Sequence, residues 1–282
     1  MAFNGSTLFR WQQASGSWQW LLDVRHVEKA FVFGGMGARN GMQAARMAKI
    51  GFTGVPASFD NENGWFRWRA FQGEGANHAS LVEGLNEEYE LSLAAMKRYP
   101  VGGPTQPAVR ALLDLRKTVS PEEVAKIVVA MPGEAATFER ANMPALNIPY
   151  LAAIIMLDGQ LDFVDAQSLD RQENDAAARD FARKVTVVRD EAQEMGEGED
   201  RTESARVTLT RKDGTVAERY VPYVPGYPTH PLSKAEVEEK AHELIEPVIG
   251  VAAANRLIAL CDDLDDAKSV DAIVELMRFK NA

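Results

Sequence analysis

Apolar residues recur with helical spacing in three separate segments of the chain. Residues 38–50 carry one face made mainly of small side chains, and Gly51 follows as a left-handed stop. Residues 104–116 place their prolines at the start, where a missing N–H costs least. Residues 147–158 are almost wholly apolar and are followed by Gly159. We therefore predict a helix in each segment.

Other helices are predicted from start signals or from weaker periodicity. The run Ser233-Lys-Ala-Glu236 has the form of a capping box, so a helical tail is expected from there to the C-terminus, interrupted at Pro247 and Gly250. Three further helical segments are expected: residues 1–25, interrupted near residues 15–17; a helix start at residues 120–123; and residues 173–184.

Strand-like patterns lie between these helices. Residues 205–220 alternate apolar and polar positions on both sides of Asp213-Gly214, which predicts a hairpin with a type I′ turn. Residues 191–204 form an acidic loop. Three short runs of strand-forming residues are also expected to be strands: residues 89–99, 127–131 and 185–188.

The order of these elements is helices, then a mixed α and β block, then helices again. This order predicts a mostly α-helical domain, incomplete and built from two chain segments, with an inserted α+β lid domain. The expected boundaries are residues 1–90 for the first helical part, 91–225 for the lid and 226–282 for the returning helices.

Composition restricts the class of protein. The chain has 282 residues, a net charge of −10 and a hydrophobic fraction of 46 %, so nucleic-acid binding is not expected. Its single cysteine, Cys261, rules out a disulfide framework, favours a cytoplasmic location and is expected to pack in the core. No secretory signal and no apolar run long enough to span a membrane are found in the sequence.

Two glycine-containing turns are candidates for binding anions. Gly34-Gly-Met-Gly37 permits a nucleotide-binding interpretation, but the spacing differs from the dinucleotide fingerprint, so a tight turn with close helix packing is favoured. Lys97 and Arg98 precede a Pro/Gly-rich turn that opens a helix, and exposed amides at a helix N-terminus attract anions. A solvated basic pair beside a structural turn is the alternative.

Single side chains supply the remaining candidate chemistry. Tyr150, at the start of an apolar helix, either donates a proton or hydrogen bond into a cleft or is a buried tyrosine with a satisfied hydroxyl. The four histidines show no metal-ligand spacing, so no metal site is expected. His26 is retained as a candidate binding group because it neighbours Glu28 and Lys29.

Four blocks in this order resemble the MmgE/PrpD family, which includes 2-methylcitrate dehydratase and cis-aconitate decarboxylase. They are Lys29 to Gly54, Lys97 to Gln106, Asn147 to Gly159, and Pro231-Leu-Ser233 with the helix that follows. The resemblance implies a helical domain carrying an α+β lid, an active site in the cleft between them, homodimers, and neither a metal nor an iron–sulfur cluster.

The resemblance also assigns roles to residues of this chain. Lys97 matches a lysine expected to bind a substrate carboxylate, Tyr150 matches a tyrosine expected near the substrate, and Lys29 is a weaker match. Many relatives have a Thr-His pair where this chain has Thr105-Gln106, and a histidine near Phe33. These departures indicate a subgroup whose substrate and reaction differ from methylcitrate dehydration.

We therefore expect a lyase-type chain acting on a small polycarboxylate by dehydration, decarboxylation or epimerisation, with no cofactor. Because the family's N-terminal helical region is missing before His26, the chain is expected to be a C-terminal portion with weak or no activity alone. The alternative is a non-catalytic or split-enzyme subunit that needs a partner chain to complete its helical core. A nucleotide-binding module ranks last.

Overall fold

The computed structural model describes residues 7–12, 18–23, 35–54, 83–194 and 203–278. The chain divides into two compact units, Met1–Leu93 and Ala94–Ala282.

The first unit begins with two strands rather than the helix expected over residues 1–25. Strands β1 (Thr7–Gln12) and β2 (Trp18–Asp23) pair in antiparallel fashion. The helix prediction is wrong, and the apolar–polar–apolar order of Trp18, Gln19 and Trp20 was a local signal for a strand.

Helix α1 (Met36–Lys49) confirms the helix predicted over residues 38–50. It is followed by Gly51, whose φ of 97° lies in the left-handed region that a glycine adopts without strain. No residue of α1 is buried, and a Cβ on Gly37 or Gly41 would meet no described atom within 4 Å. Within the described residues, the expected close packing on its small face is therefore not found.

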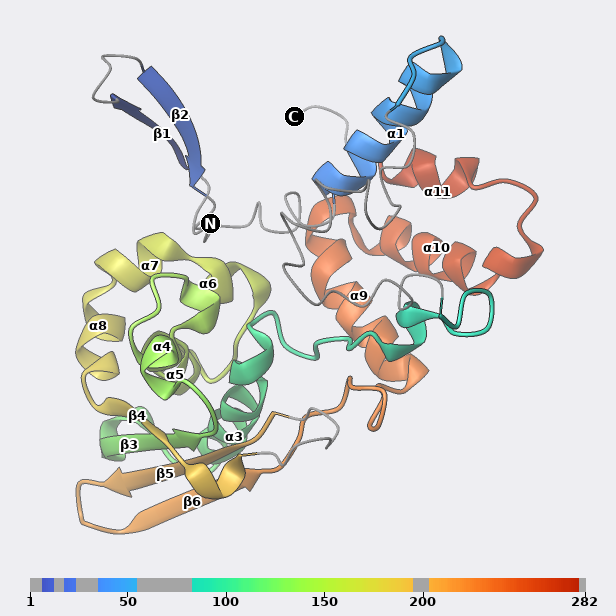
Figure 1. Cartoon of the computed structure of the whole chain (residues 1–282). Coiled ribbons are helices and arrows are strands. Elements are labelled where there is room, and N and C mark those ends of the chain that lie inside the picture. The colour runs from blue at the N-terminus through green and yellow to red at the C-terminus, as the bar shows by residue number, and fades with distance from the viewer. Residues whose placement is uncertain (1–6, 13–17, 24–34, 55–82, 195–202, 279–282) are drawn as a thin grey trace. The chain divides into compact units, whose positions relative to one another are not determined.

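A four-stranded mixed sheet forms the base of the second unit (Figure 1). Its strand order is β4-β3-β5-β6, with β3 parallel to β4 and the other neighbours antiparallel. The strands are β3 (Val124–Met131), β4 (Val185–Arg189), β5 (Ala205–Arg211) and β6 (Val216–Val221). The strands predicted at residues 127–131 and 185–188 and the hairpin at 205–220 are confirmed.

Two helices cover this sheet and supply a large part of the core. Helix α3 (Gln106–Arg116) packs against β5, β6 and α5 (Ile148–Asp158), and α5 also contacts β4 and α8 (Ala176–Ala182). Nine of the eleven residues of α5 are buried, which explains why its sequence is apolar on every side. Gly159, with a φ of 79°, ends α5 as predicted.

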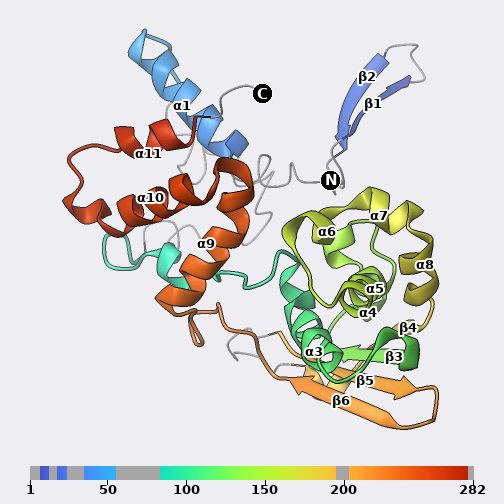
Figure 2. The ribbon, with the colours of Figure 1, turned by 180° about the vertical axis from the view of Figure 1, so that it is seen from behind.

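Short helices make the crossover between the parallel strands β3 and β4 (Figure 2). Besides α5, they are α4 (Ala135–Glu139), the 3₁₀ turn η7 (Pro144–Leu146), α6 (Phe163–Gln167), α7 (Leu169–Asn174) and α8 (Ala176–Ala182). The single helix predicted over residues 173–184 is wrong. Asp175 divides it, because its carboxylate accepts from the amides of Ala177 and Ala178 and so caps a new helix.

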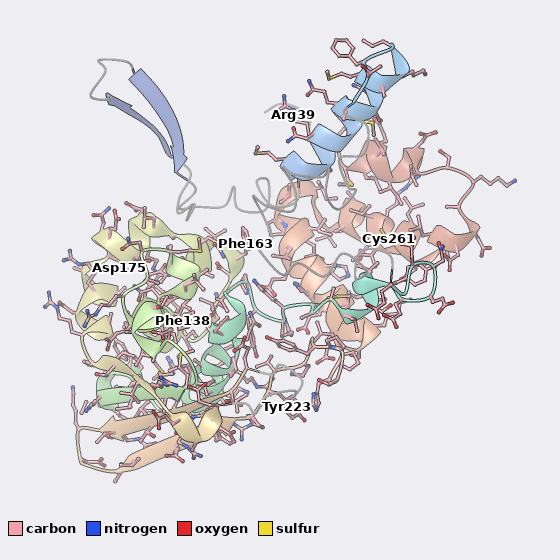
Figure 3. The ribbon with its side chains drawn as sticks, viewed as in Figure 1. Arg39, Phe138, Phe163, Asp175, Tyr223 and Cys261 are labelled. Atoms are coloured by element: carbon pink, nitrogen blue, oxygen red, sulfur yellow. The ribbon has the colours of Figure 1, made fainter. Side chains whose placement is uncertain are left out.

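The C-terminal helices follow the predicted pattern, except that the first of them continues through Pro247, where an interruption was expected. Ser233 and Glu236 form the capping box of α9 (Lys234–Ile249), and Gly250, with a φ of 82°, separates it from α10 (Val251–Asp262). The 3₁₀ turn η9 (Leu264–Asp266) leads to α11 (Asp271–Leu276). Cys261 is exposed on α10, so its predicted core position is wrong (Figure 3).

Three local predictions need correction. The strand expected over residues 89–99 is a short 3₁₀ helix, η4 (Glu90–Leu93), followed by irregular backbone. The helix start at residues 120–123 is a single 3₁₀ turn, η6 (Pro121–Glu123), that has a capping box but leads into β3. The hairpin turn is not type I′, because Gly214 has a positive φ and Asp213 does not.

The fold is therefore helix-rich with a small mixed sheet, as the predicted class requires in outline. The lid domain, the two-segment helical domain and the boundaries at residues 90 and 225 stay predictions. No helix in the described residues is long and apolar enough to cross a bilayer.

Candidate functional site

The backbone between Lys97 and α3 is held by one buried side chain, Gln106. Its Oε1 accepts from the Tyr99 amide at 2.9 Å, and its Nε2 donates to the carbonyls of Tyr99 at 2.8 Å and Val101 at 3.2 Å. Only 2 % of Gln106 is exposed. The side chain at the start of α3 therefore fixes the segment that immediately follows Lys97 and Arg98.

The same turn is tied to the segment before α5. Thr105 is fully buried and its hydroxyl donates to the Gly102 carbonyl at 2.9 Å and more weakly to the Ala145 carbonyl at 3.4 Å. The Gly102 amide donates to Ala145 O at 2.9 Å, and a Cβ on Gly102 would lie 2.1 Å from the Leu146 side chain. Both residues thus have structural contacts on every side.

Few amides of this turn remain for an anion. The amides of Gly102, Thr105 and Gln106 donate to backbone carbonyls, and Pro104 has no N–H. The turn before α3 (with 3₁₀ helix η5, Gly103–Thr105) therefore offers an anion at most the amide of Gly103.

Lys97 lines a small pocket of about 60 Å³ beside Gly103 and Gln106. Next to Lys97, the Met96 amide donates a short hydrogen bond of 2.6 Å to the Gly226 carbonyl, which ties this segment to the one around Gly226. The rest of the lining is apolar or aromatic: Ala95, Met96, Val224, Pro225 and Tyr227. We call this space the Lys97 pocket.

Sequence reasoning missed two polar groups near the Lys97 pocket. A Cβ on Gly103 would lie 3.7 Å from the Tyr227 hydroxyl and 3.9 Å from a Glu203 carboxylate oxygen, so both groups approach this glycine. Glu203 is one of few buried charged residues, at 9 % exposure. The available signal was an aromatic residue, Tyr227, inside a Gly- and Pro-rich segment.

Arg98 points to a different part of the second unit. Its guanidinium pairs with Glu239 at 2.9 Å and Glu243 at 3.8 Å, both on α9. Burial raises the pKa of Glu243, and the charge of Arg98 opposes this shift. Arg98 does not line the Lys97 pocket.

Tyr150 is buried at 3 % exposure near the start of α5. Its hydroxyl donates to the Asp165 carbonyl at 2.6 Å, so the interpretation as a satisfied buried tyrosine describes its surroundings. Burial raises the pKa of Tyr150, which keeps the phenol protonated at neutral pH. The nearby Arg171 holds Asp158, Asp165 and Asp175 in ion pairs of 2.7, 2.9 and 3.2 Å.

The predicted site residues are thus only partly brought together. Lys97 and Gln106 line one pocket, Thr105 supports it, and Arg98 and Tyr150 lie outside its lining. His26 and Lys29 lie outside the described residues. Among residues the structure does describe, no group of three or more His, Cys, Asp or Glu side chains is placed to hold a metal ion.

The other described histidines have protein partners. His230 stacks on Tyr223 with ring centroids 3.7 Å apart, and Figure 3 labels Tyr223. His242 contacts a Glu246 carboxylate oxygen at 2.7 Å within α9.

Comparison with known proteins gives one family match. A family model described as the MmgE/PrpD C-terminal domain matches residues 99–266, more than half of the chain. The matched range begins two residues after Lys97 and includes Gln106, Tyr150 and Tyr227. No curated protein matches the chain.

Proposed function

The chain belongs to the MmgE/PrpD family, and from this premise we propose that it acts as a lyase-type enzyme on a small polycarboxylate, with Lys97 binding a substrate carboxylate. The family suggests a dehydratase-like or lyase-like role. The observation that carries the finer proposal is a lysine lining a pocket whose other walls are mainly apolar.

The size of the Lys97 pocket supports binding of one carboxylate group. A space of about 60 Å³ holds such a group with some water, since a single water needs roughly 10–15 Å³ on this scale. A whole polycarboxylate is larger, so the rest of the substrate extends beyond the pocket. The apolar walls lower the local dielectric and strengthen the attraction between the ammonium and the carboxylate.

A cation at this position also serves the chemistry. Dehydration, decarboxylation and epimerisation of polycarboxylates share removal or delivery of a proton at a carbon next to a carboxylate. Neutralising that carboxylate stabilises the negative charge that develops when the proton leaves. Tyr227 and Glu203, beside Gly103, are the groups near the pocket that we propose for proton transfer or for orienting the substrate.

The other predicted residues take supporting roles in this proposal. Gln106 and Thr105 hold the turn that positions Lys97. Tyr150 acts on the substrate only if its hydroxyl leaves the Asp165 carbonyl, so we propose that it positions the segment around Asp165.

The proposal is tested by comparing Lys97→Gln with the intact chain on methylcitrate and cis-aconitate. We expect kcat/KM to fall by roughly tenfold to a hundredfold, mainly through KM, because a charge-assisted contact to a carboxylate is lost. Lys97→Arg should recover part of the loss. Arg140→Gln removes an 83 % exposed cation elsewhere and is the matched control.

Where turnover is too slow to measure, the same variants are compared by calorimetric titration with the two substrates. Binding of equal strength in Lys97→Gln and in the intact chain would refute the role of Lys97.

A second proposal concerns assembly, because α1 and the residues directly after it leave apolar side chains uncovered. Met42, Ile50 and Phe52 are 59 %, 76 % and 61 % exposed. We propose that a second copy or a partner chain covers them, which would bury roughly 1.5–3 kcal/mol per large side chain. Sedimentation of the intact chain tests this. The proposal would be contradicted if the chain is a monomer at micromolar concentration and its solubility is the same in Met42→Glu and Ile50→Glu.

A further inference from the structure

A second pocket, of about 420 Å³, is lined in part by Tyr99 and residues of α3. It shares no lining residue with the Lys97 pocket. Four cationic side chains line it against a single carboxylate, that of Asp114: they are Arg98, Arg110, Arg116 and Lys117. This concentration of positive charge is unexpected in a chain with a net charge of −10.

Helix α3 builds most of this basic pocket. Arg110, Asp114 and Lys117 are spaced by four and three residues, so they lie on one face of the helix. Asp114 accepts from Arg110 at 3.2 Å and Lys117 at 3.0 Å, and Arg219 on β6 approaches it at 3.2 Å. Three cations therefore share one carboxylate, and two positive charges remain.

The ionisation of Asp114 agrees with this arrangement. Burial raises the pKa of Asp114, but the hydrogen bonds from Lys117 and Arg110 outweigh burial and hold the pKa below its ordinary value. Asp114 is thus charged at neutral pH. The side chains around it keep a net positive charge even when the full negative charge of Asp114 is counted. Arg98 is left out of the count because Glu239 and Glu243 on α9 pair with it.

Arg116 adds a third positive charge with a defined direction. Its Nε donates to the Met156 carbonyl at 2.7 Å near the end of α5, which anchors the guanidinium. A Cβ on Gly159 would lie 3.9 Å from Nη2 of Arg116. Because glycine has no side chain, it leaves this side of the guanidinium uncovered. Among the described residues, no carboxylate lies within 4 Å of Arg116.

We propose that this basic pocket binds a small polyanion whose charged groups are carboxylates or phosphates. Arginine forks bind both groups through paired, charge-assisted hydrogen bonds, and Lys117 adds a mobile ammonium. The volume admits a molecule of the size of citrate or pyrophosphate, which the 60 Å³ Lys97 pocket does not. The site is additional to the proposed catalytic site and does not depend on it.

The test is calorimetric titration of the full chain with citrate and, separately, with pyrophosphate, at low salt. We expect saturable binding with one site for at least one of them, and the tighter ligand identifies the preferred chemistry. Binding should weaken as sodium chloride is added, because the contacts are electrostatic.

Variants locate the binding. Lys117→Gln removes a side chain that is 72 % exposed and should leave the fold intact, while lowering affinity about tenfold. Arg116→Gln should lower it further. For pyrophosphate, which carries no carboxylate, Lys97→Gln and Arg140→Gln are the matched controls and should bind as the intact chain does, which separates this site from the Lys97 pocket.

Three results would overturn the proposal. They are the absence of saturable binding for both anions, equal affinity in Lys117→Gln and the intact chain, or a loss of pyrophosphate binding in Lys97→Gln alone. The first and second would mean that the cations serve only to stabilise α3 through Asp114.

Discussion

Replacing Gln106 by leucine removes the hydrogen bonds that hold the turn after Lys97 while keeping a side chain of similar size. The Tyr99 carbonyl keeps a second partner, the Val101 amide at 2.8 Å. The Tyr99 amide and the Val101 carbonyl lose the Gln106 contacts of 2.9 and 3.2 Å. Two backbone groups are therefore left without this partner in a largely buried turn.

The expected cost follows from those two groups. An unsatisfied buried donor or acceptor costs about 1–3 kcal/mol, and the leucine regains part of this by burying apolar surface. We expect the free energy of unfolding of the second unit to fall by about 2–4 kcal/mol. The Lys97 pocket should lose affinity for carboxylates as well, since the turn then moves.

The assay uses the placement of the chromophores. All five tryptophans, at positions 11, 18, 20, 65 and 68, precede residue 94, so tryptophan fluorescence reports only the first unit. Urea unfolding is followed in parallel by far-ultraviolet circular dichroism and by fluorescence. Gln106→Leu should move the dichroism transition to lower urea and leave the fluorescence transition in place.

Gln172→Leu is the matched control. The Nε2 of Gln172 makes only long contacts of 3.3 and 3.5 Å, and its Oε1 is buried without a partner among the described residues. Removing this amide should change the free energy of unfolding by less than about 0.5 kcal/mol, or stabilise the fold. Equal dichroism shifts for the two variants would refute the reasoning that Gln106 holds the turn.

The other predictions use the same measurements. Tyr150→Phe should cost about 1 kcal/mol by losing the 2.6 Å bond to Asp165, and a kcat reduced a hundredfold with unaltered stability would show a direct catalytic role instead. Asp175→Ala should cost about 1 kcal/mol at neutral pH. The pKa of Asp175 lies below its ordinary value of 3.8, first because the Ala178 amide donates to its carboxylate and next because Arg171 pairs with it. The stabilisation that Asp175 provides is therefore present above that pH and is lost as the pH falls through the lowered pKa. A stability difference from Asp175→Ala that grows on acidification would contradict this. Gly226→Ala should cost about 2–5 kcal/mol, because its φ is 126° and its Cβ would lie 1.8 Å from the Met96 carbonyl oxygen, whereas Gly214→Ala, with a φ of 84° and open space, should cost only about 1–2 kcal/mol. Equal losses in the two glycine variants would show that the Met96 contact is not rigid.

Elements whose signals are local were predicted well. The capping box at Ser233, the stops at Gly51 and Gly159 and the alternation of residues 205–220 each act within a few residues, so their outcome is independent of the rest of the chain. The hairpin was predicted but its turn type was not, because Asp213-Gly214 also suits a three-residue loop in which only Gly214 has a positive φ.

Predictions that needed distant partners were less successful. Cys261 lies in an apolar run, but the α10 face that carries it is exposed. Arg98 was expected to bind substrate beside Lys97, but two glutamates roughly 140 residues later pair with it. Lys97 and Arg98 line different pockets although they are adjacent in the sequence, because the chain bends at Arg98.

The sequence by itself determined the family of this chain, the order of its main helices and strands, and Lys97 as the candidate carboxylate-binding residue, because motifs, periodicity and caps are written in neighbouring residues. Only the tertiary structure placed Tyr227 and Glu203 beside Gly103, gave Gln106 its role as a clamp and gathered the cations around Asp114. These arrangements join α3, β6 and loops distant in the sequence. Their geometry depends on how the elements pack, and no local pattern in the sequence specifies that packing.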